Sequence, residues 1–475
     1  MPLILGTNSI KDTGYDVANS CRFDDGSSDY LERTASSAGN RRTLTISYWL
    51  KRSNITTSNS QGVLNAGILT DGNNHSFCGF QFNTDTAIIQ TTTSNSNVMS
   101  LQTTALFRDV SAWYNFVWKV DTTQGTESNR VKLYVNGVEH SLTGTFPSQN
   151  QDTWFNYNNK HQVGTRFANY LNGYLTEMIL IDGQALDPTS FGEFDSDSPT
   201  IWKPIDVSGL TFGTNGFYLD FENASSLGAD VSGNSNNFTV NNLTSVDQSI
   251  DSCTNNFSTI NSLNTFPSNP PTLSEGNLQC RTINADPGYF GGSGTIGVST
   301  GKWYFEVKPT VSTSGIPFLI GVSYDPAEAA RQGTTASAQY SASEYVYYGH
   351  NGNKANSGSF TSYGNSYAVD DIIGVALDLD NHKIYFSKNG TFQNSGDPTT
   401  GSTGTGSAFD LTTGQTYFPF LSDGGGSVCT YQCNFGSPPY AISSGNADAN
   451  GFGNFEYAVP SGYFSLCSKN LAEFG

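Results

Sequence analysis

Two stretches of the chain, far apart in the sequence, share one strand–turn–strand pattern. In residues 369–390, VDDIIGVALDLDNHKIYFSKNG, the side chains from Ile372 to Leu377 are apolar or small at every position. Because successive side chains of a strand point to opposite faces, such a run predicts a strand that is covered on both sides. The chain then turns at 379–383 and runs back, and Asn389-Gly390 supplies the positive φ angles of a two-residue hairpin.

The second stretch is WYNFVWKVDTTQGTESNRVKLYVNGVEHSL, residues 113–142. It predicts a strand, a longer loop, a second strand, a turn at Asn136-Gly137 and a third strand. Both stretches contain the sequence motif K-[IL]-Y-[FV] before the turn. One such meander in each half of the chain predicts two β-sandwiches of similar design.

The composition agrees with an all-β fold. The chain has 31 Phe, 24 Tyr, 6 Trp and 50 Gly, and only 13 % of its residues are charged. Aromatic side chains suit a pleated, half-buried surface, and Gly suits tight turns. Helical turns are expected only on connections, at 187–194 and 325–333, where Pro follows an Asp cap. We therefore predict two antiparallel β-sandwiches.

The charge balance argues against two classes of partner. The 475 residues include 22 Lys and Arg against 41 Asp and Glu, a net charge of −19, which repels nucleic acid and anionic lipid. Met1 to Gly14 holds only a four-residue apolar run, too short for a secretory signal, and no run approaches a membrane span. We expect no membrane insertion and expect the whole chain to be the mature chain.

The seven cysteines form an odd, scattered set, which favours reduced thiols over a disulfide framework. Cys429 and Cys433 fall on one face of a strand. Without a second Cys or His pair beside them, burial is favoured over metal or redox use.

The second half of the chain, residues 272–440, resembles the SPRY domain. The matching words include GKWYFEVKP, IGVSYDP, DIIGVALDLDNHKIYFSKNGTF and YFPFLSDGGGSV, in the family's order. SPRY domains generally bind protein partners through loops, and most have no enzymatic activity, so the resemblance implies a concanavalin A-type sandwich that serves as a binding module. A C-terminal tail, 441–475, follows it.

The first half resembles a laminin G-like, concanavalin A-like jelly roll. Its words are CRFDDGSSDYLERT, LTISYWLKRS, VKLYVNGVEH and LNGYLTEMILIDGQAL. Residues 217–240 resemble the segment that usually begins such a domain, so we expect them to fold back and complete it, as in a circular permutation. This gives an N-terminal arm at 1–20, a jelly roll at 21–240 and a linker at 241–271, where Pro270-Pro271 cannot donate to a sheet.

The order of the two domains resembles virion proteins of tailed phages that infect marine bacteria and cyanobacteria. The resemblance implies a structural or adhesive fibre or appendage component on the virion, assembled in the host cytoplasm and exposed outside the cell. It implies other virion proteins and a homo-oligomer, with a trimer as one form, and a cell-surface glycan as a further partner.

No catalytic motif in the sequence has the structural context it needs. GVSTG (297–301) and GSGTIG (292–297) match G-x-S-x-G and G-x-G-x-x-G, but each requires a following helix where a strand is predicted. The five histidines form no zinc motif, and no E-x-D-x-x-E word is present. We predict a non-enzymatic protein. A glycan depolymerase stays open as an alternative because two separated carboxylates suffice for it, and a SPRY protein-interaction adaptor is the other alternative.

Candidate binding residues fall in two places. The stretch EYVYYGHNGNK places Tyr345, Tyr347 and Tyr348 before a polar loop with His350, and Tyr345 and Tyr347 share one face. Filling of the sandwich interior is the other interpretation of these rings. Trp154 lies in a polar setting, QDTWFNYNNK, and is expected to be exposed.

The candidate metal ligands are Asp220, Asp230 and Asn234, with Asp24 and Asp25 as neighbours if 217–240 folds back. Their oxygens suit Ca²⁺. Capping of turns by these Asx side chains is the favoured alternative, and no other cofactor is expected.

Overall fold

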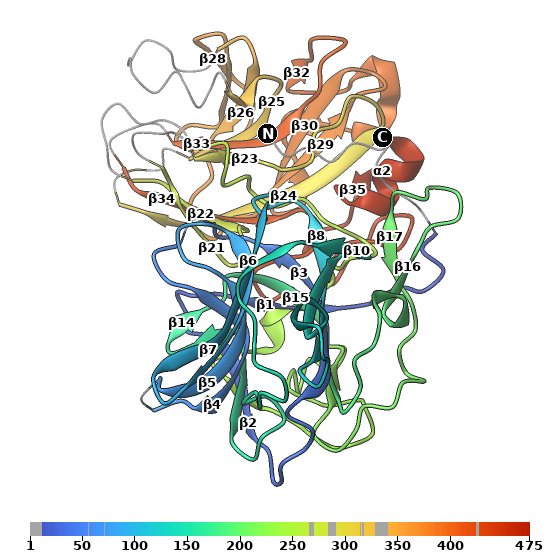
Figure 1. Cartoon of the computed structure of the whole chain (residues 1–475). Helices are drawn as coiled ribbons and strands as arrows, with labels where there is room; N and C mark the ends of the chain where they lie inside the picture. Colours follow the sequence, from blue (N-terminus) through green and yellow to red (C-terminus); the bar gives the residue numbers. More distant parts are fainter. Residues whose placement is uncertain are drawn as a thin grey trace. The chain divides into compact units, whose positions relative to one another are not determined.

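The computed structural model describes residues 12–55, 57–70, 72–265, 270–283, 291–313, 315, 318–327, 341–423 and 427–475. They form two compact units, residues 13–254 and residues 255–475. In Figure 1 the first unit runs from blue to light green, and the second from yellow-green to red.

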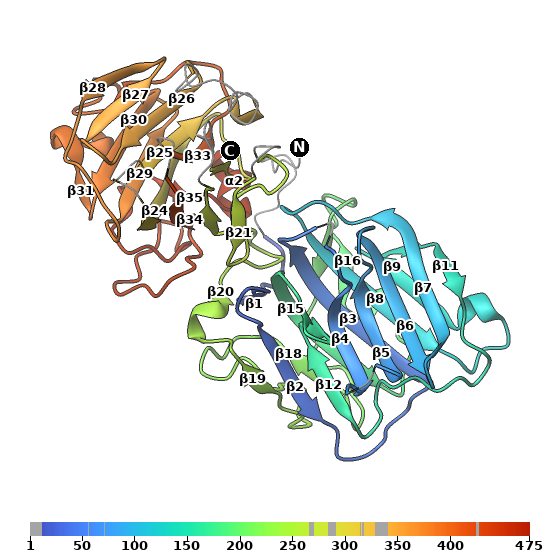
Figure 2. The same cartoon turned by 90° about the vertical axis from the view of Figure 1, so that its left-hand side faces the viewer.

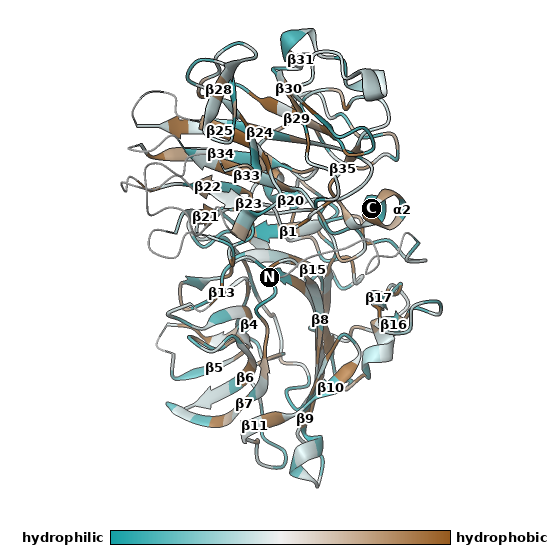
Figure 3. Ribbon diagram, turned by 90° about the horizontal axis from the view of Figure 1, so that it is seen from above, coloured by the Kyte–Doolittle hydropathy of each residue, from teal (hydrophilic) through white to brown (hydrophobic). Residues whose placement is uncertain are grey.

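The first unit is a sandwich of two antiparallel sheets. Sheet I contains, in spatial order, β10 (Val138–His140), β9 (Val131–Val135), β8 (Trp113–Asp121), β3 (Thr43–Arg52), β15 (Gly173–Asp182), β1 (Ser20–Phe23) and β20 (Gln248–Ser249), with β18 (Phe217–Leu219) paired to β15. Sheet II contains β11 (Leu142–Thr145), β7 (Ser96–Leu106), β6 (Thr86–Thr93), β5 (Asn74–Phe80), β4 (Gln61–Ile68), β12 (Lys160–Val163), β2 (Tyr30–Thr34) and β19 (Thr239–Asn241). Figure 3 shows β4 to β7 in one layer and β8, β10 and β15 in the other.

Short elements complete the first unit. They are the hairpins β13 (Thr165–Arg166) with β14 (Asn169–Tyr170) and β16 (Gly192–Phe194) with β17 (Trp202–Pro204), and the 3-10 turns η2 (Glu127–Asn129), η3 (Pro188–Ser190) and η4 (Ser245–Asp247). The helical turn expected at 187–194 is therefore η3 alone. The one expected at 325–333 lies mostly outside the described residues.

Alternation along the strands builds the core of this unit. On β6, Ala87 and Ile89 join the apolar cluster between sheets I and II, whereas Ile88 and Gln90 lie on the outward face of sheet II. Phe116 and Trp118 of sheet I are fully buried in the same cluster. The outward face of sheet II carries polar side chains such as Gln90, together with Ile88.

Residues 217–241 pack into the first unit. β18 pairs with β15, and β19 pairs with β2, with Val240 opposite Leu31. Phe217, Phe221 and Phe238 contribute to the same core. This segment thus adds one strand to each sheet, as a fold-back of the chain requires.

The linker expected at 241–271 is not a separate linker, because both of its ends are anchored. β20 pairs with β1, and the buried carboxylate of Asp251 accepts hydrogen bonds from Lys51 Nζ (2.8 Å) and Trp113 Nε1 (3.0 Å). On the other side, Ile260 is fully buried in the second unit. The first unit also begins before the expected residue 21, since Val17 N–H donates to Thr254 Oγ1.

The second unit is also a sandwich. Sheet III contains β21 (Thr272–Ser274), β22 (Gln279–Arg281), β34 (Cys429–Asn434), β24 (Lys302–Ser312), β29 (Ile373–Asp378), β30 (Lys383–Lys388) and β31 (Thr391–Phe392), with β32 (Phe409–Asp410) beside β30 and β35 (Phe464–Ser465) parallel to β24. Sheet IV contains β23 (Gly292–Ser293), β33 (Phe418–Asp423), β25 (Phe318–Ser323), β26 (Glu344–Tyr348), β27 (Asn353–Asn356) and β28 (Ser359–Ser362). The 3-10 turns η5 (Gln393–Ser395) and η6 (Pro398–Thr403) and the helix α2 (Ser468–Phe474) lie on connections and at the C-terminus.

Both Asn-Gly hairpins are present. Asn136 and Gly137 have φ angles of 48° and 76°, and Asn389 and Gly390 have 48° and 78°. β29 is buried along its whole length, as its sequence predicts. Together the sheets confirm the all-β, two-sandwich fold class.

The C-terminal tail packs on its own unit. The buried carboxylate of Glu306 accepts hydrogen bonds from the backbone N–H groups of Glu456 (3.0 Å) and Tyr457 (2.9 Å). Phe455 and Tyr463 join Tyr304 and Ala376 in an apolar cluster. The tail therefore covers the second face of β24 and β29.

Candidate functional site

Two of the candidate tyrosines are core residues. Tyr345 and Tyr347 are 6 % and 0 % exposed and belong to the main cluster of the second unit. Tyr345 Oη lies 2.9 Å from Thr412 Oγ1, and Tyr347 Oη donates to the backbone carbonyl of Asn365. Their shared face, predicted from alternation, is the inner face of sheet IV, so these two rings are not contact residues.

Tyr348 lies on the opposite face of sheet IV, with His350 nearby. The Tyr348 ring centroid is 5.8 Å from that of His350 and 5.5 Å from that of Phe360, whose side chain is 41 % exposed. These three rings form an accessible aromatic group, which we call the sheet IV aromatic group.

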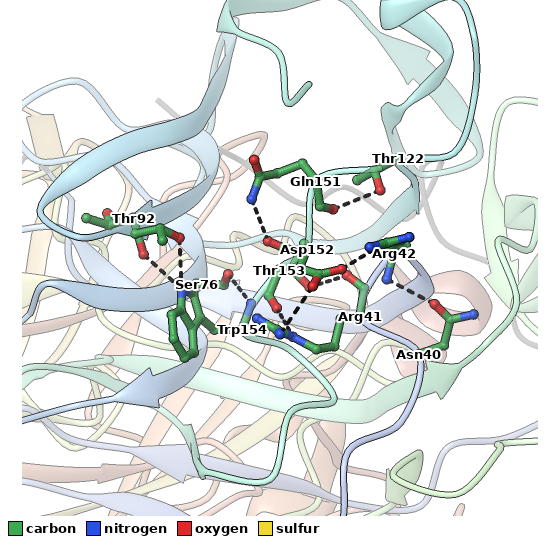
Figure 4. Close-up of polar contacts among 11 residues, drawn as sticks. Asn40, Arg41, Arg42, Ser76, Thr92, Thr122, Gln151, Asp152, Thr153 and Trp154 are labelled. Atoms are coloured by element: carbon green, nitrogen blue, oxygen red, sulfur yellow. Dashed lines mark hydrogen bonds and ion pairs between the residues drawn. The ribbon is translucent and has the colours of Figure 1, made fainter. Parts of the chain in front are cut away.

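Trp154 is half-buried and held by its neighbours, contrary to the exposure expected for it. Its indole Nε1 donates to the carbonyl of Thr92 (2.9 Å), and the guanidinium carbon of Arg41 lies 5.3 Å from its ring centroid. Figure 4 shows Trp154 beside the ion pairs that Asp152 makes with Arg41 and Arg42. Trp154 thus fixes the 152–154 segment to β6.

The candidate calcium ligands form hydrogen bonds with the backbone of their own segment, residues 213–236. The two carboxylate oxygens of Asp230 accept hydrogen bonds from the N–H groups of Tyr218, Ser232 and Asn236. The amide of Asn234 donates to the Gly213 and Gly216 carbonyls, and Asp220 accepts from Glu222 N–H.

These contacts fit the capping of turns by Asx side chains. Among the described residues, no group of three or more His, Cys, Asp or Glu side chains is placed to hold a metal.

The described residues also contain no helix long and apolar enough to cross a membrane. After the Ser of GVSTG the chain enters β24, a strand, so the geometry of a nucleophile elbow is missing at that motif.

One pocket of the first unit lies at a place that no sequence motif marks. It has a volume of about 730 Å³ and lies on the outward face of sheet II. Its floor comes from rows of paired residues: Ile88, Gln102 and Thr143 in one row, and Gln90, Ser100 and Thr145 in the next. We call this the amide pocket. Figure 2 shows the strands that form its floor, β6, β7 and β11, side by side.

Two connections form the walls of the amide pocket. Ser58, Asn59 and Ser60 precede β4, and Arg166 and Asn169 belong to the β13–β14 hairpin. Phe82, 45 % exposed, adds an aromatic side chain to the rim. The lining thus consists mainly of amides and hydroxyls, with one aromatic ring, Ile88 and Arg166.

The charge of the amide pocket is small. Its described lining contains Arg166 as the single charged residue and no Asp or Glu. Burial lowers the pKa of the Arg166 guanidinium to about 10, so it stays cationic at neutral pH. Glycoside hydrolysis needs a pair of carboxyl groups beside the bond that breaks. The lining can hydrogen-bond a polar ligand and supplies no such pair.

A second pocket of about 610 Å³ lies on the other side of the same hairpin. It includes Thr165, Phe167 and Tyr170, and the ring of Tyr170 lies 6.0 Å from that of Tyr30 across the pocket. We call this the tyrosine pocket. Both pockets belong to the first unit.

The most strongly perturbed carboxyl group lies elsewhere, on sheet I. Glu177 is 4 % exposed, has a φ of 49° and accepts hydrogen bonds from Tyr218 Oη to both of its oxygens, at 2.9 Å each. Burial raises the pKa of Glu177 to about 8. The negative charges of Asp220, Glu222 and Asp206 add to this rise.

Comparison with protein families assigns both halves. Residues 25–189 match the model described as the Concanavalin A-like lectin/glucanases superfamily, and residues 302–438 match the SPRY domain. The chain contains a concanavalin A-like domain followed by a SPRY domain. Both pockets lie in the concanavalin A-like domain, and the sheet IV aromatic group lies in the SPRY domain.

Solved structures resemble the two domains at low identity. The SPRY domain of human HERC1 is 17 % identical, with a TM-score of 0.25, over 33 % of this chain and 93 % of that chain. A SAP-like pentraxin from Limulus polyphemus is 14 % identical (TM-score 0.26; 36 % and 79 % covered). Stonustoxin is 16 % identical (TM-score 0.28; 37 % and 27 % covered). A comparison with curated proteins found no match.

Proposed function

We propose that this chain is a non-catalytic binding protein whose concanavalin A-like domain holds a neutral glycan in the amide pocket. The observation that carries the proposal is the lining of that pocket: outward amides and hydroxyls, an exposed ring and no carboxylate. Sugars offer hydroxyl groups that pair with amides, and apolar ring faces that pack on aromatic side chains. A few placed polar groups in a pocket are typical of small-ligand sites.

The biological setting we propose is a tailed-phage virion, where the protein serves as a structural and adhesive component of a fibre or appendage. The order of the two domains supports this setting through the resemblance noted above. Symmetric repetition on a particle, for example as a trimer, would let weak single sites add up through effective concentration. Mass spectrometry of purified particles tests it: the protein should be present in stoichiometric copies, and its absence would refute the setting.

A pocket-filling variant tests the binding site. Ser100 lies on the pocket floor and is partly exposed, so Ser100→Trp should fill the pocket and abolish binding to neutral oligosaccharides on a glycan array and in calorimetry. Gln102→Ala, which removes one amide, should weaken binding roughly three- to tenfold.

Thr104→Trp is the matched control. Thr104 is an exposed residue of the same strand and lies outside the pocket lining, so this variant should bind like the wild type. Full binding by Ser100→Trp would reject the amide pocket as the site. Release of reducing ends from any bound glycan would show a depolymerase instead.

The sheet IV aromatic group supports a second candidate function. Tyr348, His350 and Phe360 offer accessible rings of the kind enriched in protein interfaces. On a virion, such a surface would contact a neighbouring subunit. Phe360→Ser should then weaken assembly and leave glycan binding unchanged.

A further inference from the structure

The β13–β14 hairpin separates the two pockets of sheet II. Arg166 and Asn169 line the amide pocket, whereas Phe167 and Tyr170 line the tyrosine pocket. The hairpin lies directly on β4: a β-carbon built at Gly62 would be 2.8 Å from the Thr165 carbonyl oxygen. It therefore covers the middle of a surface that is open on both sides.

The surface under the hairpin is polar, and several of its buried polar atoms have no hydrogen-bond partner. Asn65 is fully buried, and neither its Oδ1 nor its Nδ2 has a hydrogen-bond partner. Gln61 Oε1 and His75 Nε2 are also buried without a partner, and so is Thr165 Oγ1 on the hairpin itself. Native proteins leave few such atoms, because a buried polar atom without a partner has lost its contact with water.

The hairpin is joined to the sheet at its base and through side-chain contacts. Directly before β13, Gly164 N–H donates to the Val63 carbonyl of β4 (3.0 Å), and Gln61 Nε2 lies 3.5 Å from the Tyr170 carbonyl, the outer limit for a hydrogen bond. The Arg166 guanidinium lies 4.0 Å from the Phe77 ring centroid, and Phe167 packs edge-on against His75.

The turn of the hairpin is strained. Phe167 and Ala168 have φ angles of 50° and 61°, which side chains with a β-carbon rarely adopt. This strain belongs to the hairpin itself, whereas the buried polar atoms without partners are a cost of the closed position.

We infer that the surface under the hairpin is a third, covered subsite that joins the two pockets into one track for an extended neutral polysaccharide. A single row of paired residues crosses the sheet: Gln162, Asn65, Phe77, Gln90, Ser100 and Thr145. From β12 to β11 this row makes five strand-to-strand steps, about 24 Å in all.

This row is longer than a single sugar unit, and its length fits a chain of several sugar units. When the hairpin lifts, the Asn65 amide, the Gln61 carbonyl and His75 Nε2 take up the hydroxyl groups of the central sugars. The inference rests on the proposed function for its ligand class and adds a dependence on chain length, because only a long ligand spans all three subsites.

Two variants shift the hairpin in opposite directions. Gly62→Ala places a β-carbon against the Thr165 carbonyl and the Arg166 stem, which the closed hairpin cannot accept, so it props the hairpin open. Asn65→Leu replaces the unpartnered amide by an apolar side chain of similar branching and keeps the hairpin closed. Gly125→Ala is the control, because a β-carbon there meets nothing within 4 Å.

The position of the hairpin can be measured without any ligand. Histidines are modified with diethyl pyrocarbonate, and mass spectrometry of the full chain gives the rate at each histidine. His75 is covered by Phe167, His161 is fully buried and reports global unfolding, and His350 is exposed. We expect His75 to react faster than His161 in the wild type, about tenfold faster still in Gly62→Ala, and more slowly in Asn65→Leu. Equal protection of His75 and His161 in the wild type and in Gly62→Ala would overturn the inference.

Titration with neutral disaccharides and hexasaccharides of one linkage series tests the ligand. The hexasaccharide should bind more tightly than the disaccharide, gain affinity in Gly62→Ala and lose it in Asn65→Leu, while the disaccharide responds to neither change. Equal affinities for both lengths in all variants would overturn the covered subsite and leave the amide pocket standing. Binding of neither length overturns the proposed function and the ligand assigned here, and the His75 rates then still decide whether the hairpin opens.

Discussion

At the scale of single residues, Glu177 is a buried carboxyl group whose pKa is raised to about 8. It lies at a bulge of β15 with a positive φ, and Tyr218 donates to its carboxyl group. Burial is the largest cause of its raised pKa, and the negative charges of Asp220, Glu222 and Asp206 add to it. The protonated form is therefore the one that the fold prefers.

This preference makes stability depend on pH. The folded pKa of about 8 lies above the ordinary value of 4.5, so the folded state holds a proton that the unfolded state has already lost. The contribution is fully present below pH 4.5 and is lost as the pH rises to 8, by roughly 3–5 kcal/mol. Glu177→Gln removes this loss, so its free energy of unfolding should exceed that of the wild type by an amount that grows from pH 5 to pH 8. Parallel stability curves in urea titrations at these pH values would contradict the assignment.

Alternation along strands predicts which way a side chain points, and it correctly placed Tyr345 and Tyr347 on one face opposite Tyr348. It does not predict which strands become neighbours. Gln90, Ser100 and Thr145 belong to three strands that meet only through the pairing of sheet II. Alternating polar residues in TAIIQTTT and SNVMSLQTTAL predict an outward polar face. The pocket on this face also needs a wall, which the hairpin of residues 165–170 supplies.

At the scale of elements, turns that carry Asn or Gly can be predicted from the sequence, and turns without these residues cannot. The residue types alone predict the turns at Asn136-Gly137 and Asn389-Gly390. Phe167-Ala168 adopts the same sign of φ without Gly or Asn, so no turn signal marks it. The anchoring of the predicted linker 241–271 was missed for a similar reason: its anchors, Asp251 and Ile260, are isolated residues without periodicity.

The C-terminal tail provides a test at this scale. Glu306 receives hydrogen bonds from two tail N–H groups and from Tyr304 Oη (3.1 Å), and burial raises its pKa. Glu306→Ala should lower the free energy of unfolding by roughly 2–4 kcal/mol, because buried donors lose their acceptor. It should also make the 441–475 segment sensitive to limited proteolysis.

The control for the tail is Asp370→Ala. Its ion pair with Lys308 is largely exposed, with 73 % of the Asp370 side chain accessible, so its loss should cost under about 1 kcal/mol. A tail that stays resistant to protease in Glu306→Ala would show that the apolar cluster alone holds it.

At the scale of the whole molecule, the chain combines two sandwiches that use their surfaces differently. The first leaves an outward face rich in amides and hydroxyls, and the second covers one face with the tail and leaves accessible rings on the other. The net charge of −19 disfavours polyanionic partners for either. The two proposed contacts, one with a glycan and one with a protein, would suit a component that links a particle to a surface.

The most direct test of this account is a crystal structure of the full chain with a bound neutral hexasaccharide. The account predicts intact sugar along the outward face of sheet II, against Gln90, Ser100 and Gln102 and under a displaced β13–β14 hairpin. Sugar bound elsewhere on the molecule, or found cleaved, would contradict it.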